Sequence, residues 1–358
     1  MHILVLFIGL STFASSANLS AEKAVRIGLK NNPGLRQIQK RYEALKEVPS
    51  QVESLPDPMV TFGLLNFPTD TFNRTQEAMT NVQVGFSQYF PYPGKLDLKG
   101  EIAEFEASAA LHSVEEVRLL LAYHIESTWW QVYYFDRALE TIQNNQRLLR
   151  QFTQIAEEKY KTGEGLQQDV LLAQLELSKL LDQEIQVKAL RRNQSINLNL
   201  LMAKDPSKDV HLAKKRIRTL SRKMNEKYLY RLASDYRPSL KRENAKILAS
   251  ASRLNLAKKE FYPDFTVGVS YGDRAGYNPG TFNDPRADLF SLKVGVKVPL
   301  YYKTKQSKAV EQRFIEQQER YAGLEDEKLK VMAEISKNYT NYREAKKQLS
   351  LFKTGILP

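Results

Sequence analysis

The sequence predicts an α+β membrane protein built from two internal repeats, each joining a pair of β-strands to long helices. Three short motifs recur in the same order at nearly the same offset. They are Asn32-Pro33-Gly34-Leu35 with Arg237-Pro238-Ser239-Leu240, Leu55-Pro56-Asp57-Pro58 with Tyr262-Pro263-Asp264-Phe265, and Val84-Gly85-Phe86 with Val294-Gly295-Val296. A duplication of this length determines the architecture before any single motif is interpreted.

The longest helical region lies between Pro93 and Pro206, where the chain contains no proline and is rich in Leu, Ala, Glu, Gln, Lys and Arg. Gly163 and Gly165 divide it into arms expected at 95–161 and 166–202, the first on the order of 100 Å long. An apolar stripe at helical spacing runs along the first arm, at Val114, Val117, Leu121, Ile125 and Trp129. We therefore expect a long coiled-coil hairpin whose tip lies at the two glycines.

Four segments have the character of β-strands: 59–67, 82–90, 265–272 and 290–298. The alternation is imperfect in the first and clear in the other three, with apolar side chains on one face and small or polar ones on the other. A half-buried sheet of a soluble protein alternates in the same way. An N-terminal signal, the flanking helices and aromatic residues at the strand ends favour transmembrane strands around a wet lumen. The residues expected to face lipid are Val84, Phe86, Phe265, Val267, Val269, Phe290, Leu292, Val294, Val296 and Val298.

The first 17 residues are typical of a signal peptide, with an apolar run from Ile3 to Leu10 and small residues at Ser15-Ser16-Ala17. Because this segment has no Lys or Arg, a buried apolar helix is the alternative, and the natural start of the protein could lie upstream. The domain prediction is a signal peptide at 1–17, a first repeat at 18–205, a connection at 206–224 and a second repeat at 225–358.

Composition argues against several other classes of protein. The chain has no cysteine, which excludes disulfides and thiolate sites. Its net charge of +12 is dispersed along helical stretches together with Glu and Gln, which is typical of solvated helix faces and not of a nucleic-acid partner. The four histidines form no metal-ligand pair at helical spacing, and no catalytic constellation is visible, so we expect no enzyme, no cofactor and no metal site.

Taken together, these segments resemble the TolC family of outer-membrane efflux proteins. The most specific motifs are Leu55-Pro56-Asp57-Pro58, the run from Tyr89 to Lys95, Tyr160-Lys161-Thr162-Gly163 and Phe261-Tyr262-Pro263-Asp264. The Pro-Asp-Pro motif and the Pro-Gly-Lys motif are most similar to the branch that serves heavy-metal or cation exporters, the CusC and CzcC kind.

The resemblance implies a homotrimer in which each protomer gives four strands to one shared β-barrel, continued by a long α-helical coiled-coil tunnel into the periplasm. It implies an outer-membrane location and a passive exit duct for an inner-membrane pump, joined through a periplasmic adaptor. Four strands cannot enclose a water-filled lumen, and unpaired strand edges are not tolerated in lipid, which agrees with a shared barrel.

Two groups of residues are candidate sites. The adaptor-docking tip carried over from the family comprises Tyr160, Gly163, Gly165, Leu166 and Asp169, although the glycines could equally serve only as a turn. The strand–helix junctions are expected at Pro56, Pro58, Pro91, Pro93, Gly94, Pro263 and Pro299, because proline suits the end of a strand ladder and the first turn of a helix.

Alternative functions remain open at this point. A secreted periplasmic coiled-coil adaptor or structural protein would account for the helices, and a type I secretion duct would use the same fold. The repeat offset also places a second hairpin tip beyond residue 358, so we expect the sequence to be part of a longer protein that includes the residues of the periplasmic gate. The residues do not indicate which solute, pump or adaptor is involved.

Overall fold

The computed structural model describes residues 18–213, 225–281 and 283–356. The expected signal peptide, 1–17, and residues 214–224 of the expected inter-repeat connection lie outside the described residues. Contacts divide the chain into two compact units. Of the described residues, unit 1 contains 18–38 and 114–213, and unit 2 contains 39–113, 225–281 and 283–356.

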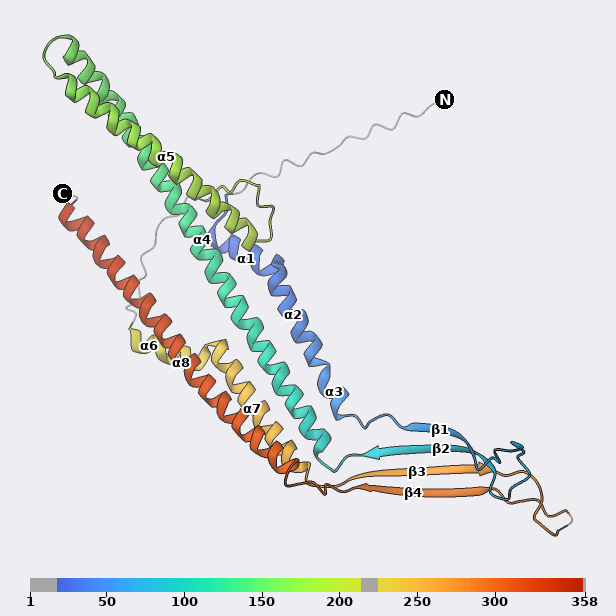
Figure 1. The fold of residues 1–358 in the computed structure, drawn as a ribbon. Helices are drawn as coiled ribbons and strands as arrows, with labels where there is room; N and C mark the ends of the chain where they lie inside the picture. The colour runs from blue at the N-terminus through green and yellow to red at the C-terminus, as the bar shows by residue number, and fades with distance from the viewer. Residues whose placement is uncertain (1–17, 214–224, 282, 357–358) are drawn as a thin grey trace, which may run out of the picture. The chain divides into compact units, whose positions relative to one another are not determined.

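Unit 2 contains a single four-stranded antiparallel sheet in the order β1-β2-β3-β4 (Figure 1). The strands are β1 (Met59–Leu65), β2 (Asn81–Phe90), β3 (Asp264–Asp273) and β4 (Leu289–Lys297), so all four predicted strands are confirmed. The repeats meet in the centre of the sheet, where β2 pairs with β3. Within the described chain, β1 and β4 are each paired along one edge only.

The two strand hairpins have the same register, which relates the repeats residue by residue. A shift of 207 residues carries β1 onto β3, and a shift of 208 carries β2 onto β4. With these shifts the pair Met59–Ser87 of the first hairpin falls on the pair Thr266–Gly295 of the second. The Val-Gly motifs suggested 210 for the second strand of each pair. The residues matched by sequence motif are therefore two positions away from the residues matched by structure. Because side chains alternate with period two, this difference leaves each side chain on the same face of the sheet.

The helices of unit 2 comprise α3 (Val48–Glu53), α6 (Glu226–Tyr236), α7 (Pro238–Lys259) and α8 (Gln306–Leu351), with parts of α2 and α4. A short π-helical segment, Phe352–Ile356, follows α8. Pro238 occupies the first turn of α7, where its missing N–H has no helical partner to lose. The helices α7 and α8 pack through a buried cluster of Leu240, Ile247, Leu324 and Val331.

Unit 1 contains α1 (Ala21–Asn31), the start of α2 (Pro33–Lys46), most of α4 (Lys95–Lys161) and α5 (Gln167–Leu201). The two long arms end within a residue of their predicted bounds. Trp129 is fully buried, and its indole Nε1 donates to the carbonyl oxygen of Leu19 at 2.9 Å. A Cβ at Gly28 would lie 2.2 Å from Ile125 Cδ1, so a larger residue there would require the Ile125 side chain to move.

The predicted apolar stripe of the first arm is buried at Val114, Leu121, Ile125 and Trp129, and Val117 is half-buried. These residues lie on successive turns of α4, so three-to-four spacing places them on one buried face. Among the described helices, none is long and apolar enough to cross a bilayer.

Candidate functional surfaces

One face of the sheet is a continuous exposed apolar surface. Residues that pair across antiparallel strands share a face, so the register joins side chains from all four strands. This apolar sheet face comprises Val60, Phe62, Leu64, Val84, Phe86, Phe90, Phe265, Val267, Val269, Tyr271, Phe290, Leu292, Val294 and Val296. Their exposed fractions run from 36% at Phe265 to 73% at Phe62 and Phe290. An exposed apolar patch of this extent marks a surface that meets lipid or a partner.

The opposite face of the same strands is small and polar. It carries Thr61, Gly63, Gln83, Gly85, Ser87, Thr266, Gly268, Ser270, Ser291, Lys293, Gly295 and Lys297. Gln83 Nε2 donates to Ser270 Oγ at 2.7 Å across β2 and β3, so this face forms its own polar contacts. A sheet with one apolar and one polar face, and with no helix packed on the apolar side, suits a boundary between lipid and water.

Nine of the ten residues predicted to face lipid lie on the apolar sheet face, and Val298 lies one residue beyond the end of β4. Sequence reasoning missed Val60, Phe62 and Leu64 of β1. Their signal was present, because apolar residues alternate there with Thr61 and Gly63. Met59 and Leu65, at the two ends of the strand, obscured the pattern.

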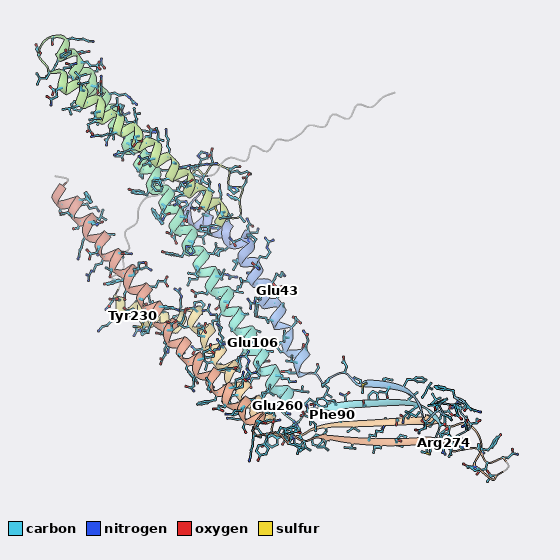
Figure 2. The ribbon with its side chains drawn as sticks, in the orientation of Figure 1. Glu43, Phe90, Glu106, Tyr230, Glu260 and Arg274 are labelled. Carbon is cyan, nitrogen blue, oxygen red and sulfur yellow. The ribbon has the colours of Figure 1, made fainter. Side chains whose placement is uncertain are left out.

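At the far end of the sheet, arginines join the two inter-strand loops. Arg286 Nη1 donates to the carbonyl oxygens of Thr75 and Glu77 at 3.2 and 3.0 Å, and Arg274 Nη1 donates to that of Ala78 at 3.2 Å. Arg74 forms an ion pair with Asp273. Figure 2 places Arg274 at this end, and Phe90 and Glu260 at the end where the helices begin. Hydrogen bonds between repeats therefore fix the loops.

A buried ion cluster lies at the end of the sheet near the helices, and we call it the junction cluster: Lys95, Glu260, Asp264 and Tyr89. Lys95 Nζ lies 2.8 Å from Asp264 Oδ1 and 3.2 Å from Glu260 Oε2, with Lys95 3% and Asp264 6% exposed. Tyr89 donates its hydroxyl to Asp264 Oδ2 at 2.6 Å, and the Tyr92 backbone N–H donates to Oδ1 at 2.9 Å. The cluster ties the end of the first strand pair to the start of the second.

The predicted junction residues all lie between strands and helices. Pro56 and Pro58 lie between α3 and β1, Pro91, Pro93 and Gly94 between β2 and α4, Pro263 between α7 and β3, and Pro299 between β4 and α8. Gly94 has φ +82°, and a Cβ there would lie 2.4 Å from Lys259 Nζ. Lys259 Nζ in turn donates to the Pro93 carbonyl at 3.0 Å. Sequence reasoning found the Pro-Gly-Lys and Pro-Asp motifs but did not pair Lys95 with Asp264.

The hairpin tip in unit 1 gathers the five residues predicted for docking. Gly163 has φ +81°, and its N–H donates to the Tyr160 carbonyl at 3.1 Å, while Gly165 N–H donates to that of Lys159 at 3.0 Å. Leu166 precedes α5, and Asp169 lies in the first turn of that helix. Tyr160 and Leu166 are 48% and 66% exposed, so the tip presents two apolar side chains beside the turn.

Polar contacts hold the two arms together behind the tip. Gln143 and Gln146 of α4 donate to the carboxylate of Glu184 on α5, at 3.1 and 2.9 Å. Hydrogen bonds from Lys188 first, and then from Gln146 and Gln143, lower the pKa of Glu184 to about 2. Glu184 therefore stays ionised and accepts these bonds across the neutral range.

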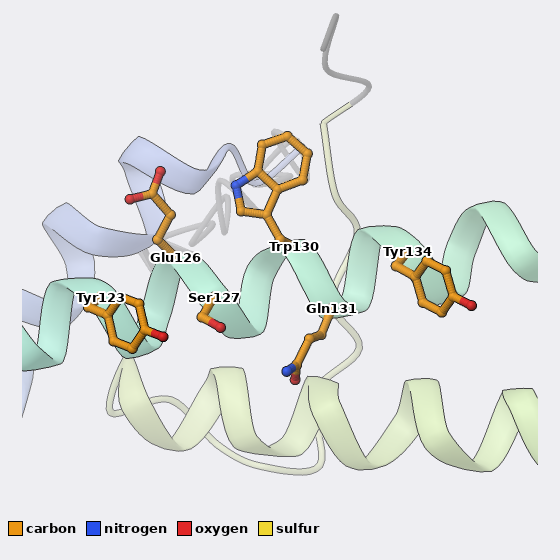
Figure 3. Close-up of a pocket in the computed structure, with 6 residues that line it drawn as sticks. All are labelled: Tyr123, Glu126, Ser127, Trp130, Gln131 and Tyr134. Atoms are coloured by element: carbon orange, nitrogen blue, oxygen red, sulfur yellow. The ribbon is translucent and has the colours of Figure 1, made fainter. Parts of the chain in front are cut away.

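A shallow hollow of about 490 Å³ lies on unit 1, lined by Tyr123, Glu126, Ser127, Trp130, Gln131 and Tyr134. Figure 3 shows that all six come from consecutive turns of α4. The hollow is thus a groove along the outside of one helix and not an enclosed pocket.

Comparison with known proteins follows from this geometry. The family model described as outer membrane efflux protein matches residues 25–204 and 229–355. The chain belongs to the outer membrane efflux protein family. No curated protein sequence matched the chain.

Solved structures share the fold of this family member. The outer-membrane channel OprN superposes with a TM-score of 0.76 at 16% identity, over 93% of this chain and 76% of that one. The CusC structure gives 0.73 at 13% identity, over 93% and 78%. The outer membrane protein VceC from Vibrio cholerae gives 0.73 at 16% identity, over 94% and 82%.

Family and fold together establish the class of protein. The chain is an outer-membrane efflux channel of the kind used in tripartite systems, with its helices extending into the periplasm, and it is not an enzyme. The predicted family, fold class and location are therefore confirmed at this level. The family match favours the channel over the alternative of a secreted periplasmic coiled-coil adaptor or structural protein.

Proposed function

We propose that three copies of this chain form one outer-membrane duct, the passive exit of an inner-membrane pump, with a heavy metal or another cation as the solute. The observation that carries the duct is the apolar sheet face, which spans all four strands and is backed by a polar face. Four strands are too few to surround a water-filled lumen. In a barrel shared among copies, the open edges of β1 and β4 are paired, and the strands of several chains together surround the lumen.

The proposal for the solute rests on two sequence motifs. The Pro-Asp-Pro motif at 56–58 and the Pro-Gly-Lys motif at 93–95 resemble the branch of heavy-metal exporters. CusC is among the similar structures, at 13% identity, which supports the fold alone. The duct itself needs no metal-binding residue, because a wide polar lumen passes hydrated ions.

The duct is tested by a pair of matched variants on β4. Val294→Arg puts a charge on the apolar sheet face, which costs roughly 2–4 kcal/mol at the middle of a bilayer. We expect this variant to disappear from the outer-membrane fraction and from the trimer band. Ser291→Arg, on the polar face of the same strand, should insert and assemble normally. Recovery of the unmodified chain as a soluble periplasmic monomer would contradict the proposal.

We also propose that the tip binds a periplasmic adaptor through Tyr160 and Leu166, with Gly163 and Gly165 shaping the turn and Asp169 beginning α5. Leu166→Asp should abolish export in cells, measured as lost tolerance to a panel of metal salts, while trimer yield and single-channel conductance stay normal. Leu171→Asp, the same change at an α5 leucine that is 57% exposed against 66% for Leu166, is the matched control. Equal loss of export in both variants would show that the tip has no special role.

A further inference from the structure

The first repeat contains the two carboxylates that correspond to those of the junction cluster, but no lysine in the described part of the chain is bound to them. Glu260 and Asp264 belong to the sequence Glu-x-x-Pro-Asp, and the same pattern stands at Glu53, Pro56 and Asp57. The distance between the copies is 207 residues, which is the shift that carries β1 onto β3. The carboxylates of the second copy lie 3.2 and 2.8 Å from the ammonium group of Lys95.

The carboxylates of the first copy form no ion pair with any residue that the structure describes. Within residues 18–213, 225–281 and 283–356, the side chains of Glu53 and Asp57 form no ion pair and no hydrogen bond, and both are exposed. The Glu53 carboxylate lies over Gly100, where a Cβ would approach within 1.8 Å. Two like charges are therefore held at the start of β1 without compensation.

Lysines occupy the matching positions on the other open edge. The shift of 208 that carries β2 onto β4 carries Lys95 to Lys303 and Tyr89 to Lys297. Both lysines are exposed, and neither forms an ion pair with a carboxylate in the described part of the chain, although Lys297 lies opposite Asp264 where β4 pairs with β3. The unpaired cations stand beside β4, and the unpaired anions stand beside β1.

The internal contact between β2 and β3 shows how the two open edges can meet. In that contact Phe86 lies opposite Val269. The same shifts turn this pair into Val294 of one copy opposite Phe62 of another, and both belong to the apolar sheet face. Pairing of β4 with a second β1 in this register therefore continues the apolar face across the boundary between copies.

We propose that a second copy of this chain adds its β1 to β4, and that Lys303 then binds between Glu53 and Asp57 of the partner subunit, with Lys297 in the place of Tyr89. This interface rests on the proposed duct and specifies how its subunits recognise one another. It repeats between chains the contact that joins the two repeats within a chain. Because two ammonium groups face two carboxylates, it gives orientation as well as attraction.

Replacement of Tyr89 by Lys297 makes the proposed interface more ionic than its internal copy. In the internal cluster one lysine, Lys95, forms the ion pairs; the Lys95–Asp264 pair is buried, and Glu260 is 47% exposed. Lysine in place of tyrosine adds a charge that water and salt can reach, so assembly should weaken as ionic strength rises. The internal cluster should not respond to salt in this way.

The register is tested with cysteines, because the natural chain has none. Residues opposite each other in an antiparallel pair have Cβ atoms about 4.5–5.5 Å apart, within reach of a disulfide after slight adjustment. The full chain carrying Phe62→Cys and Val294→Cys should give dimers and trimers on oxidation. The control Thr61→Cys with Val294→Cys places the thiols on opposite faces and should give none. Equal cross-linking of both pairs would overturn the register.

The ion cluster is tested by exchanging charges in the full chain. Lys303→Glu should weaken the trimer on the order of tenfold in dissociation, as loss of a partly buried pair implies. Adding Asp57→Lys should restore most of the loss. Lys305→Glu, the same change two residues away on another exposed lysine without an ion pair in the described chain, is the matched control and should leave the trimer intact.

The outcomes separate this interface from the proposed duct. A trimer that forms and conducts, with Lys303→Glu no weaker than Lys305→Glu or with no rescue by Asp57→Lys, overturns the ion cluster and leaves the duct standing. A natural chain that never associates in the membrane overturns both. Weakening confined to Lys303→Glu, rescue by the double variant and cross-linking confined to the 62–294 pair support the interface.

Discussion

The two copies of the Glu-x-x-Pro-Asp motif share their defining residues, but the aspartate is buried and paired in one copy and exposed in the other. Asp264 is 6% exposed and is bound by Lys95, Tyr89 and the backbone of Tyr92. Asp57 is exposed and has no partner among the described residues. The difference arises from connectivity, because β3 has the first repeat as its neighbour within the chain, whereas β1 lies at the edge of the sheet. Among the described residues of one chain, only the second copy of the motif is paired with a lysine. The first copy is therefore available to bind a lysine of another chain.

Neutralising the aspartate in each copy of the motif should show most clearly that Asp264 stabilises the fold and Asp57 serves assembly. Asp264→Asn leaves the buried Lys95 ammonium with Glu260 and the Tyr262 carbonyl as its partners, which should destabilise the fold by about 3 kcal/mol, since breaking a buried pair is expensive. Asp57→Asn should change the unfolding free energy by less than about 0.5 kcal/mol, as an exposed site does. Denaturant unfolding of monomers dispersed in detergent measures both.

The same two variants also differ in assembly. Asp57→Asn should lower the temperature at which the trimer dissociates, with the unfolding of the separated chain unchanged. If Asp57→Asn and Asp264→Asn reduced the unfolding free energy equally, the first copy would be a buried cluster too, and the contrast between them would be lost.

The glycine of the junction is the next largest difference between the copies. Gly94 has φ +82°, whereas its counterpart by the shift of 208, Tyr302, has no positive φ. Gly94→Ala combines left-handed strain of about 1–2 kcal/mol with displacement of Lys259, whose Nζ lies 2.4 Å from the new Cβ. We expect a loss of about 2 kcal/mol, measured by thermal unfolding.

Gly163→Ala is the matched control for that experiment. It has φ +81° and no heavy atom within 4 Å of the added Cβ, so it carries the strain alone. A loss from Gly94→Ala no greater than that from Gly163→Ala would mean that Lys259 moves aside without cost. The position of Lys259 against Pro93 would then contribute nothing to the junction.

The long helices could be predicted from the sequence almost to the residue. Pro93 and Gly94 precede α4, and Gly163 and Gly165 follow it, so local conformational preference fixes both ends of Lys95–Lys161. Strands with clean alternation were found as easily. In β1 the end residues Met59 and Leu65 hid the pattern, because they are apolar on the polar face.

The junction cluster could not be predicted, although both of its motifs were noticed. Lys95 and Asp264 are 169 residues apart, and they meet only because β2 pairs with β3 in one register. Register is a property of the assembled sheet, and a slip of two residues preserves the alternation that sequence reveals. The Val-Gly motifs suggested that slip, and the observed pairs Met59–Ser87 and Thr266–Gly295 correct it.

The smallest expected effect concerns the position that is tyrosine in one copy and lysine in the other. Tyr89→Phe removes the hydroxyl that donates to Asp264 at 2.6 Å, and the carboxylate keeps Lys95 and the Tyr92 N–H. The loss should be about 1 kcal/mol, as for a single hydrogen bond with remaining partners. Tyr92→Phe is the matched control, because its ring stacks on Tyr262 at 4.5 Å and its hydroxyl forms no hydrogen bond in the described chain.

The reciprocal change, Lys297→Tyr, gives the proposed interface the same residue as the internal cluster. Lys297 lies opposite Asp264 across β3 and β4 but is exposed, so the change should alter the unfolding free energy of the separated chain by less than about 0.5 kcal/mol. It should make trimer dissociation less dependent on salt, because one of the two facing cations is gone. Dissociation measured at low and high ionic strength tests this. An unchanged salt dependence would place Lys297 away from the boundary between copies, and the difference between Tyr89 and Lys297 would then have no part in assembly.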